Sequence, residues 1–210
     1  MAKHNGLALV LASSSPRRQE LIGLLQLPVI VRASHADESV PEDWEPAKIV
    51  EELSLRKARA TEESLAADGL GVEPAPESWV IVGSDTIVVV DGKVLGKPVD
   101  EEDAFRMLSS LQGRRHEVYT GVACLPGGGL KDNPPAVSHT VSQVTFSPMT
   151  EEEIWSYIRT GEPMDKAGAY GVQGMGALFI EKIAGDFFSV MGLPVNRLYQ
   201  MLGKWGISPF

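Results

Sequence analysis

Apolar runs separated by polar turns divide the chain into short strands and amphipathic helices. Leu9–Leu11 and Val29–Val31 are apolar runs of strand length, which predicts two short, buried strands. Between them, leucines recur at helical spacing after Pro16. Proline suits the first position of a helix and serine the position before it. The pattern therefore predicts a strand, a tight turn and a helix that begins at Pro16, with Ser15 as its N-cap.

A longer helix is predicted over residues 45–67, where Val50, Leu53 and Lys57 fall on one face. A lysine is unexpected in line with an apolar stripe. Either its stem lies along the protein surface with the ammonium group in water, or the side chain points into a cleft. The first arrangement is the commoner one, and the spacing alone leaves both interpretations open.

Residues 79–90 are apolar on both sides of a polar interruption, Gly83–Thr86. The Asp91-Gly92 pair that follows is typical of a two-residue hairpin turn. Asp85 is unusual within a strand, because aspartate is depleted there. If it is buried it needs a cation or a metal as partner. If the interruption is a polar turn, its own backbone satisfies it. The residues alone support both interpretations equally.

The remaining sequence alternates between strand and helix patterns. It predicts strands over 116–125 and 136–146 and helices over 101–111, 150–159 and 193–202. Residues 67–78 and 126–135 are loops rich in Gly and Pro that carry no catalytic pattern. The glycine-dense segment 165–176 precedes a strand pattern, which does not fit a dinucleotide-binding fingerprint. Helices, strands and a hairpin together favour an α/β or α+β chain with a mixed sheet.

Composition limits the functional classes. Hydrophobic residues make up 43% and charged residues 22% of the 210 residues, as in soluble globular proteins. The single cysteine, Cys124, excludes an internal disulfide, and the four histidines lack zinc-site spacing. No apolar run approaches the roughly 20 residues that span a membrane. The opening residues, MAKHNG, lack the apolar stretch of a secretory signal. We therefore expect a cytoplasmic protein with no membrane partner.

The charge is acidic overall but basic near the start. The net charge of −9 argues against a nucleic-acid partner. Residues 1–34 nevertheless hold four basic residues and one acidic residue. Two of the basic residues, Arg17 and Arg18, lie at the predicted helix start, where backbone N–H groups favour an anion such as phosphate. This distribution indicates a small anionic ligand, and an ordinary capped helix with solvated arginines is the alternative.

Six sequence blocks occur in one order along the chain and change the balance between these alternative interpretations. They are ASSSPRRQEL, LRKARA, VGSDTIVVVDGKVLGKP, HEVYTGVA, MDKAGAYGVQGMGALF and GDFFSVMGLP. With them the chain resembles the Maf family of nucleoside triphosphate pyrophosphatases from Leu9 to Leu202. The resemblance implies a single domain, 1–210, with an elongated mixed sheet flanked by helices. It also implies two lobes around a cleft, similar to inosine triphosphate pyrophosphatase.

The resemblance further implies the reaction and its participants. Proteins of this family hydrolyse a nucleoside triphosphate to the monophosphate and pyrophosphate with a divalent metal, Mg²⁺ or Mn²⁺, commonly as cytoplasmic homodimers. Their catalytic aspartate falls on Asp85, as general base or metal ligand, with Ser84 in place of the usual alanine. A metal-associated acid falls on Glu38, with Asp37 beside it. The substrate-contacting positions fall on Ser14, Arg17, Arg18, Lys57, Thr86, Lys97 and Gln173.

The glutamine in the block YGVQG, Gln173, bears on the base. Within the resembled family this glutamine accompanies the branch that acts on dTTP and UTP. A carboxamide offers one acceptor and one NH₂ donor, which matches the edge of uracil or thymine. The resemblance thus implies a dTTP/UTP pyrophosphatase that extends to modified uridine triphosphates. The alternatives are a 7-methyl-GTP pyrophosphatase and a nucleotide-binding regulator of cell division without turnover.

Overall fold

A computed structural model describes residues 6–33 and 35–210 of the chain. The first five residues, which bear on the expectation of no secretory signal, lie outside this part. The chain forms two compact units. The first comprises residues 1–85, 120–139 and 192–210, and the second comprises residues 86–119 and 140–191. A strand in which one of these ranges ends and the next begins therefore contributes residues to both units.

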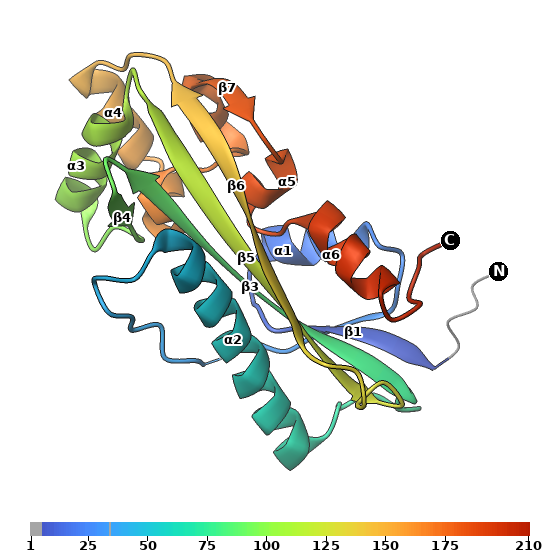
Figure 1. Cartoon of the computed structure of the whole chain (residues 1–210). Coiled ribbons are helices and arrows are strands. Elements are labelled where there is room, and N and C mark those ends of the chain that lie inside the picture. The colour runs from blue at the N-terminus through green and yellow to red at the C-terminus, as the bar shows by residue number, and fades with distance from the viewer. Residues whose placement is uncertain (1–5, 34) are drawn as a thin grey trace. The chain divides into compact units, whose positions relative to one another are not determined.

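The elements follow one another as strands and helices along the chain (Figure 1). The strands are β1 (Leu7–Leu11), β2 (Val29–Val31), β3 (Ser78–Val90), β4 (Lys93–Leu95), β5 (Arg115–Gly128), β6 (Ala136–Phe146) and β7 (Ile180–Ala184). The α-helices are α1 (Pro16–Gly23), α2 (Pro46–Asp68), α3 (Glu101–Leu111), α4 (Glu151–Ile158), α5 (Phe187–Met191) and α6 (Val195–Gly203). Three short 3₁₀ helices are η1 (Glu162–Asp165), η2 (Ala167–Ala169) and η3 (Gly174–Phe179).

The strands form one mixed sheet in the order β2-β1-β3-β5-β6-β7, and β4 pairs with β3. β1 runs parallel to both β2 and β3, with Leu9 opposite Val29 and Val80. β4 is antiparallel to β3, and β7 is antiparallel to β6. The predicted α/β class with a mixed sheet flanked by helices is confirmed.

Local turn and cap signals were mostly sufficient to place the elements. Asp91 and Gly92 both adopt positive φ in the β3–β4 turn, as a two-residue hairpin requires. Thr150 and Glu153 form a capping box at the start of α4. The prediction of Ser15 as the N-cap residue of α1 is confirmed. Ser15 occupies the cap position, but its hydroxyl makes no cap hydrogen bond.

β5 extends three residues into the segment expected to be a loop. Pro126–Gly128 complete the strand because the two glycines lie against the Trp79 indole of β3. A Cβ atom on Gly127 would lie 2.2 Å from Trp79 Nε1. The large ring comes so close that the strand needs residues without a side chain at these positions. Glycine is also typical of turns, so the sequence pattern predicted a loop here.

In the first unit, α2 packs tightly against strands β3 and β5. A Cβ on Gly83 would lie 2.1 Å from the Ser54 carbonyl oxygen, and one on Gly121 would lie 2.2 Å from the Val50 carbonyl oxygen. Glycine at these two strand positions allows the helix backbone to approach the sheet. Ala58 and Leu65 of α2 then join the buried core of this unit. Figure 1 shows α2 along one side of these strands.

The second unit has a core of its own, centred on an aromatic group. The rings of His116, Phe146 and Tyr170 meet edge to face. His116 Nε2 and the Tyr170 hydroxyl are 2.7 Å apart, whereas His116 Nδ1 has no hydrogen-bond partner among the described residues. Burial lowers the pKa of His116 from 6.5 to about 4. The imidazole is therefore neutral in the folded protein at pH 7.

We expect this histidine to make the free energy of unfolding depend on pH. The unfolded chain binds a proton near pH 6.5 and the folded chain only near pH 4, so the stabilisation is complete above 6.5 and is lost as the pH falls towards 4. Between pH 6.5 and 5 the loss is about 2 kcal/mol. Urea unfolding at both pH values should show this loss, and it should be largely absent in His116→Gln. Equal losses in the two proteins would contradict the assignment.

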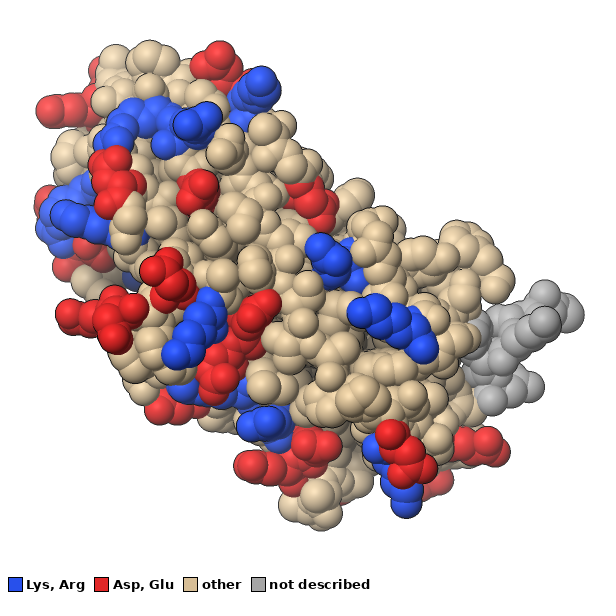
Figure 2. Space-filling model, in the orientation of Figure 1, with Lys and Arg blue, Asp and Glu red and all other residues tan. Residues whose placement is uncertain are grey.

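Two surface properties bear on partners. Within residues 6–33 and 35–210, every helix falls short of the length and apolar character that a membrane crossing requires. On the face drawn in Figure 2, basic and acidic side chains are interspersed. That face lacks the continuous basic surface with which proteins contact a nucleic-acid backbone.

Candidate active site

The turn from β1 into α1 brings the first group of polar residues together. β1 is buried almost throughout and ends at Leu11. α1 begins five residues later at Pro16, whose missing N–H costs nothing at this position. In the turn, Ser13 Oγ accepts a hydrogen bond from the Ser15 backbone N–H at 3.2 Å. Ser14 is exposed, and the first turn of α1 follows with Arg17 and Arg18.

Arg18 is held in place by two contacts within the first unit. Its Nε donates to the Gly192 carbonyl oxygen at 2.8 Å, and its Nη1 lies 3.5 Å from Ser13 Oγ. Burial lowers the pKa of Arg18, and the charges of Asp85 and Glu38 act in the opposite direction. An arginine remains protonated at neutral pH in either case. The guanidinium is thus a fixed positive charge within the electrostatic reach of two carboxylates.

Those two carboxylates share one ammonium group. Lys57 Nζ lies 2.5 Å from Asp85 Oδ1 and 2.8 Å from Glu38 Oε1. The side chains of Lys57 and Asp85 are 12% and 11% exposed, whereas that of Glu38 is 59% exposed. The surface arrangement of Lys57 is therefore excluded, and its side chain is almost enclosed. Asp85 is buried within the continuous strand β3 and has the cation that burial requires.

The geometry of α2 explains why Lys57 reaches Asp85. Val50 and Leu53 on the same helix face are buried, and the glycine contacts at Gly83 and Gly121 bring the helix close to the sheet. Lys57 lies one turn further along this face, opposite the polar interruption of β3. A long side chain at that position has the reach to place its charge beside Asp85.

Ser84 links three segments of the first unit, a role that no local sequence pattern indicates. Its hydroxyl oxygen lies 2.7 Å from the Gly121 carbonyl oxygen and 2.9 Å from the Gly192 carbonyl oxygen. Gly192 is the residue whose carbonyl also accepts from Arg18. Ser84 is fully buried. It therefore fixes the carbonyl that orients Arg18.

Thr86, Lys97 and Gln173 belong to the second unit. Thr86 is half-buried in β3, and Lys97 and Gln173 are exposed.

The segment that carries Gln173 is anchored by Glu162, which the sequence did not single out. The Glu162 carboxylate accepts hydrogen bonds from the backbone N–H groups of Met175 and Gly176, at 2.9 and 3.0 Å. The Tyr157 hydroxyl donates to the same carboxylate at 2.8 Å. These contacts order the residues that directly follow Gln173.

The donor set of the first unit fits a divalent metal held by few protein ligands. Among the described residues, no group of three or more His, Cys, Asp or Glu side chains converges as a metal cluster. Asp85 and Glu38 nevertheless converge on one cation, the Lys57 ammonium. Carboxylate oxygens suit Mg²⁺ and Mn²⁺, and Mg²⁺ usually takes one or two carboxylates together with substrate phosphates and water. The pair is therefore compatible with such an ion.

Comparisons with known proteins agree with the blocks in the sequence. A family model described as Maf-like protein matches residues 8–205. The dTTP/UTP pyrophosphatase of Symbiobacterium thermophilum is 46% identical over 202 residues, which cover 96% of each chain. That of Moorella thermoacetica is 47% identical over 202 residues, which cover 95% of this chain and 96% of the relative.

Among solved structures, that of the Staphylococcus aureus Ham1 protein covers 82% of this chain and 79% of that chain. Its sequence identity is 15% and its TM-score is 0.41. A similarity of this size is too low to support an argument about function.

Proposed function

This chain belongs to the Maf family, and on that premise we propose that it hydrolyses dTTP and UTP to the nucleoside monophosphate and pyrophosphate. The names of the relatives, which match over nearly their whole length, support this substrate class. The observation that carries the proposal is the buried Asp85–Lys57 pair, within electrostatic reach of Arg18. A carboxylate and cations gathered at the end of β1 are the groups that water activation on a polyphosphate requires.

In the proposed reaction, water attacks the α-phosphorus and the bond to the β-phosphate oxygen breaks, so that pyrophosphate leaves. Arg17, Arg18 and the first turn of α1 bind phosphate oxygens. The Lys57 ammonium, which already lies between two acids, adds a further positive charge. Lys57 Nζ donates to Oδ1 of the Asp85 carboxylate. Asp85 Oδ2 is therefore available to orient the attacking water and accept its proton.

The proposal includes a divalent cation, Mg²⁺ or Mn²⁺, held by Glu38 and Asp85. Such an ion supplies positive charge that offsets the negative charge of the leaving pyrophosphate. Ser14, Thr86, Lys97 and Gln173 complete the proposed set of substrate contacts. We further propose that residues 1–210 act as a single Maf-like domain and that the protein is a cytoplasmic homodimer. Its proposed binding partner is a small nucleotide, and not a nucleic acid or a membrane.

The decisive experiment measures pyrophosphate release from a panel of nucleoside triphosphates. We expect release from dTTP and UTP with Mg²⁺ or Mn²⁺, abolition of this release by excess chelator, and recovery when the metal is restored. Binding without release on any nucleotide would instead identify a regulator without turnover. Full activity in excess chelator would contradict the metal-assisted reaction.

Gln173 gives a prediction about base preference. A carboxylate cannot donate to a base carbonyl, so Gln173→Glu should leave that carbonyl without its donor. An unpaired polar group of this kind costs about 1–3 kcal/mol, and we expect kcat/KM on UTP to fall about tenfold.

The measurement compares kcat/KM on UTP, CTP and 7-methyl-GTP for both proteins. Met175→Leu is the matched control in the same segment, because its exposed side chain changes shape without changing charge. A wild-type protein with its highest kcat/KM on 7-methyl-GTP would refute the pyrimidine assignment.

A further inference from the structure

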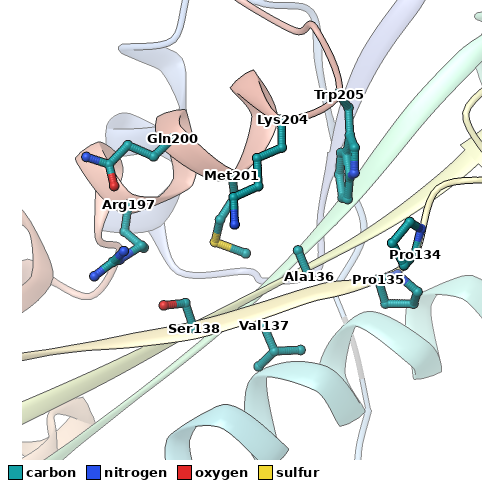
Figure 3. A pocket seen from close by; sticks show the side chains of 10 residues that line it. All are labelled: Pro134, Pro135, Ala136, Val137, Ser138, Arg197, Gln200, Met201, Lys204 and Trp205. Atoms are coloured by element: carbon teal, nitrogen blue, oxygen red, sulfur yellow. The ribbon is translucent and has the colours of Figure 1, made fainter.

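A cavity of about 370 Å³ lies in the first unit between α6 and the beginning of β6 (Figure 3). None of the residues that line it belongs to the proposed active site. Its volume is near the lower end of the range of about 300–1,000 Å³ that small-molecule sites occupy.

The α6 wall presents one helix face. Arg197, Met201 and Lys204 follow at intervals of four and three residues, which places them in line along the helix. Met201 is buried and contributes apolar surface to the cavity lining. In Figure 3 the Lys204 side chain extends back over Met201, so its ammonium group lies on the side of the preceding turn. This direction is the usual one for long helical side chains.

The cavity is positively charged in an acidic protein. Its lining contains Arg197 and Lys204 and no aspartate or glutamate. Between residues 187 and 210, Arg197 and Lys204 are the two basic residues and there is no acidic residue, although the net charge of the whole chain is −9. The ion pairs of the described residues involve neither of them. Two cations without a carboxylate partner on one wall favour an anionic ligand.

The remaining walls suit a flat, partly polar body. The Trp205 indole and two prolines provide apolar surface, and an indole face stacks well on aromatic rings. Gln200, whose Nε2 donates to Asn196 Oδ1 at 3.1 Å, lies at the Arg197 end of the cavity, away from Trp205 (Figure 3). The Ser138 hydroxyl on β6 adds a second polar group. The cavity therefore matches a ligand that has an anionic end and an aromatic end.

We propose that this cavity binds a small aromatic phosphate of the nucleoside monophosphate class. The phosphate lies between Arg197 and Lys204, and the base lies against Trp205. The assignment depends on the cavity alone and stands whether or not the chain has the proposed hydrolytic activity. If both hold, the cavity is a second site that senses the product of the reaction.

The test follows the Trp205 indole N–H signal in ¹H–¹⁵N NMR spectra of the whole protein. The chain has four tryptophans, and Trp205→Phe identifies which signal is that of Trp205. UMP should shift this signal saturably. Uridine, which lacks the phosphate, and inorganic phosphate, which lacks the base, should each bind at least about tenfold more weakly. Phosphate that binds as tightly as UMP, or a signal that UMP does not move, would overturn the proposal.

Charge variants separate this cavity from the active site. The double variant Arg197→Ala/Lys204→Ala should raise the Kd for UMP at Trp205 at least about tenfold. Lys93→Ala removes an exposed lysine of β4 in the other unit and should leave the Kd unchanged. An unchanged Kd in the double variant would refute the site. Pyrophosphate release from UTP at low product concentration is measured on the same proteins, so failure of the proposed hydrolysis is recognised separately.

Discussion

Asp85→Asn is expected to lower kcat for pyrophosphate release by about 10²–10⁴-fold, the usual contribution of a general base. The amide keeps the shape of the side chain, and its oxygen still accepts a hydrogen bond from Lys57. The negative charge and the basicity that water activation needs are lost. Because Lys57 retains Glu38 at 2.8 Å, we expect the variant to fold and to bind nucleotide nearly as well as the wild type. Single-turnover kinetics and nucleotide binding measure the two properties separately.

Two neighbouring acids provide the controls for Asp85. Asp37 is held by the backbone N–H and the hydroxyl of Ser39 at 2.9 and 2.8 Å, so Asp37→Asn should leave turnover nearly unchanged. Glu38→Gln removes the acid that shares Lys57 with Asp85, and it should raise the metal concentration required for activity. Near-normal kcat in folded Asp85→Asn would move the basic role to another residue, and Glu38 would be examined first.

The sequence predicted the elements but not the partners that give two of the polar residues their roles. Helical spacing placed Lys57 beside Val50 and Leu53, and both of these are buried as expected. The spacing did not distinguish a surface lysine from an enclosed one. The reason is that its partner, Asp85, lies 28 residues away on another element. Periodicity describes one helix face and carries no information about what that face meets.

Ser84 and Glu162 were missed for the same physical reason. The importance of Ser84 lies in its contacts with carbonyl groups 37 and 108 residues away along the chain. Glu162 follows a helix-ending glycine and reads as a solvated acid. Its carboxylate instead accepts two backbone N–H groups more than ten residues later. Hydrogen bonds between distant segments leave no local pattern in a single sequence.

The glycines of the first unit show a different limit of prediction from sequence, because here a local signal is present but points to the wrong structure. Gly83 and Gly121 stand within strands, where glycine is unfavourable by propensity. The chain retains the strands because α2 occupies the space that Cβ atoms would need. Propensity alone marked Gly83–Thr86 as an interruption, whereas packing makes it the continuous strand that holds Ser84 and Asp85. Tertiary contact thus reverses the local preference where the proposed site is built.

Lys57→Met is expected to reduce kcat/KM on UTP by about 10²-fold. Methionine preserves most of the apolar stem and removes the charge, and a hydrogen bond to a charged group contributes about 1.5–3 kcal/mol. The variant also leaves the enclosed Asp85 carboxylate without its cation, so the melting temperature should fall in the presence of chelator. Excess Mg²⁺ should raise the melting temperature back towards the wild-type value, because a divalent cation replaces the lost positive charge between Asp85 and Glu38.

Lys48→Met is the matched control for this substitution. Lys48 is an exposed lysine of the same helix, 3.9 Å from the Trp44 ring centre, and its replacement should leave kcat/KM within about twofold of wild type. Thermal unfolding with chelator and with Mg²⁺ is measured for both variants. If Lys57 had a merely structural role, the melting temperature of Lys57→Met would be lower and Mg²⁺ would not raise it. Wild-type kcat/KM in folded Lys57→Met would show that the ammonium group does not act on the substrate. That result would leave Arg17 and Arg18 as the cations of the first unit that bind phosphate.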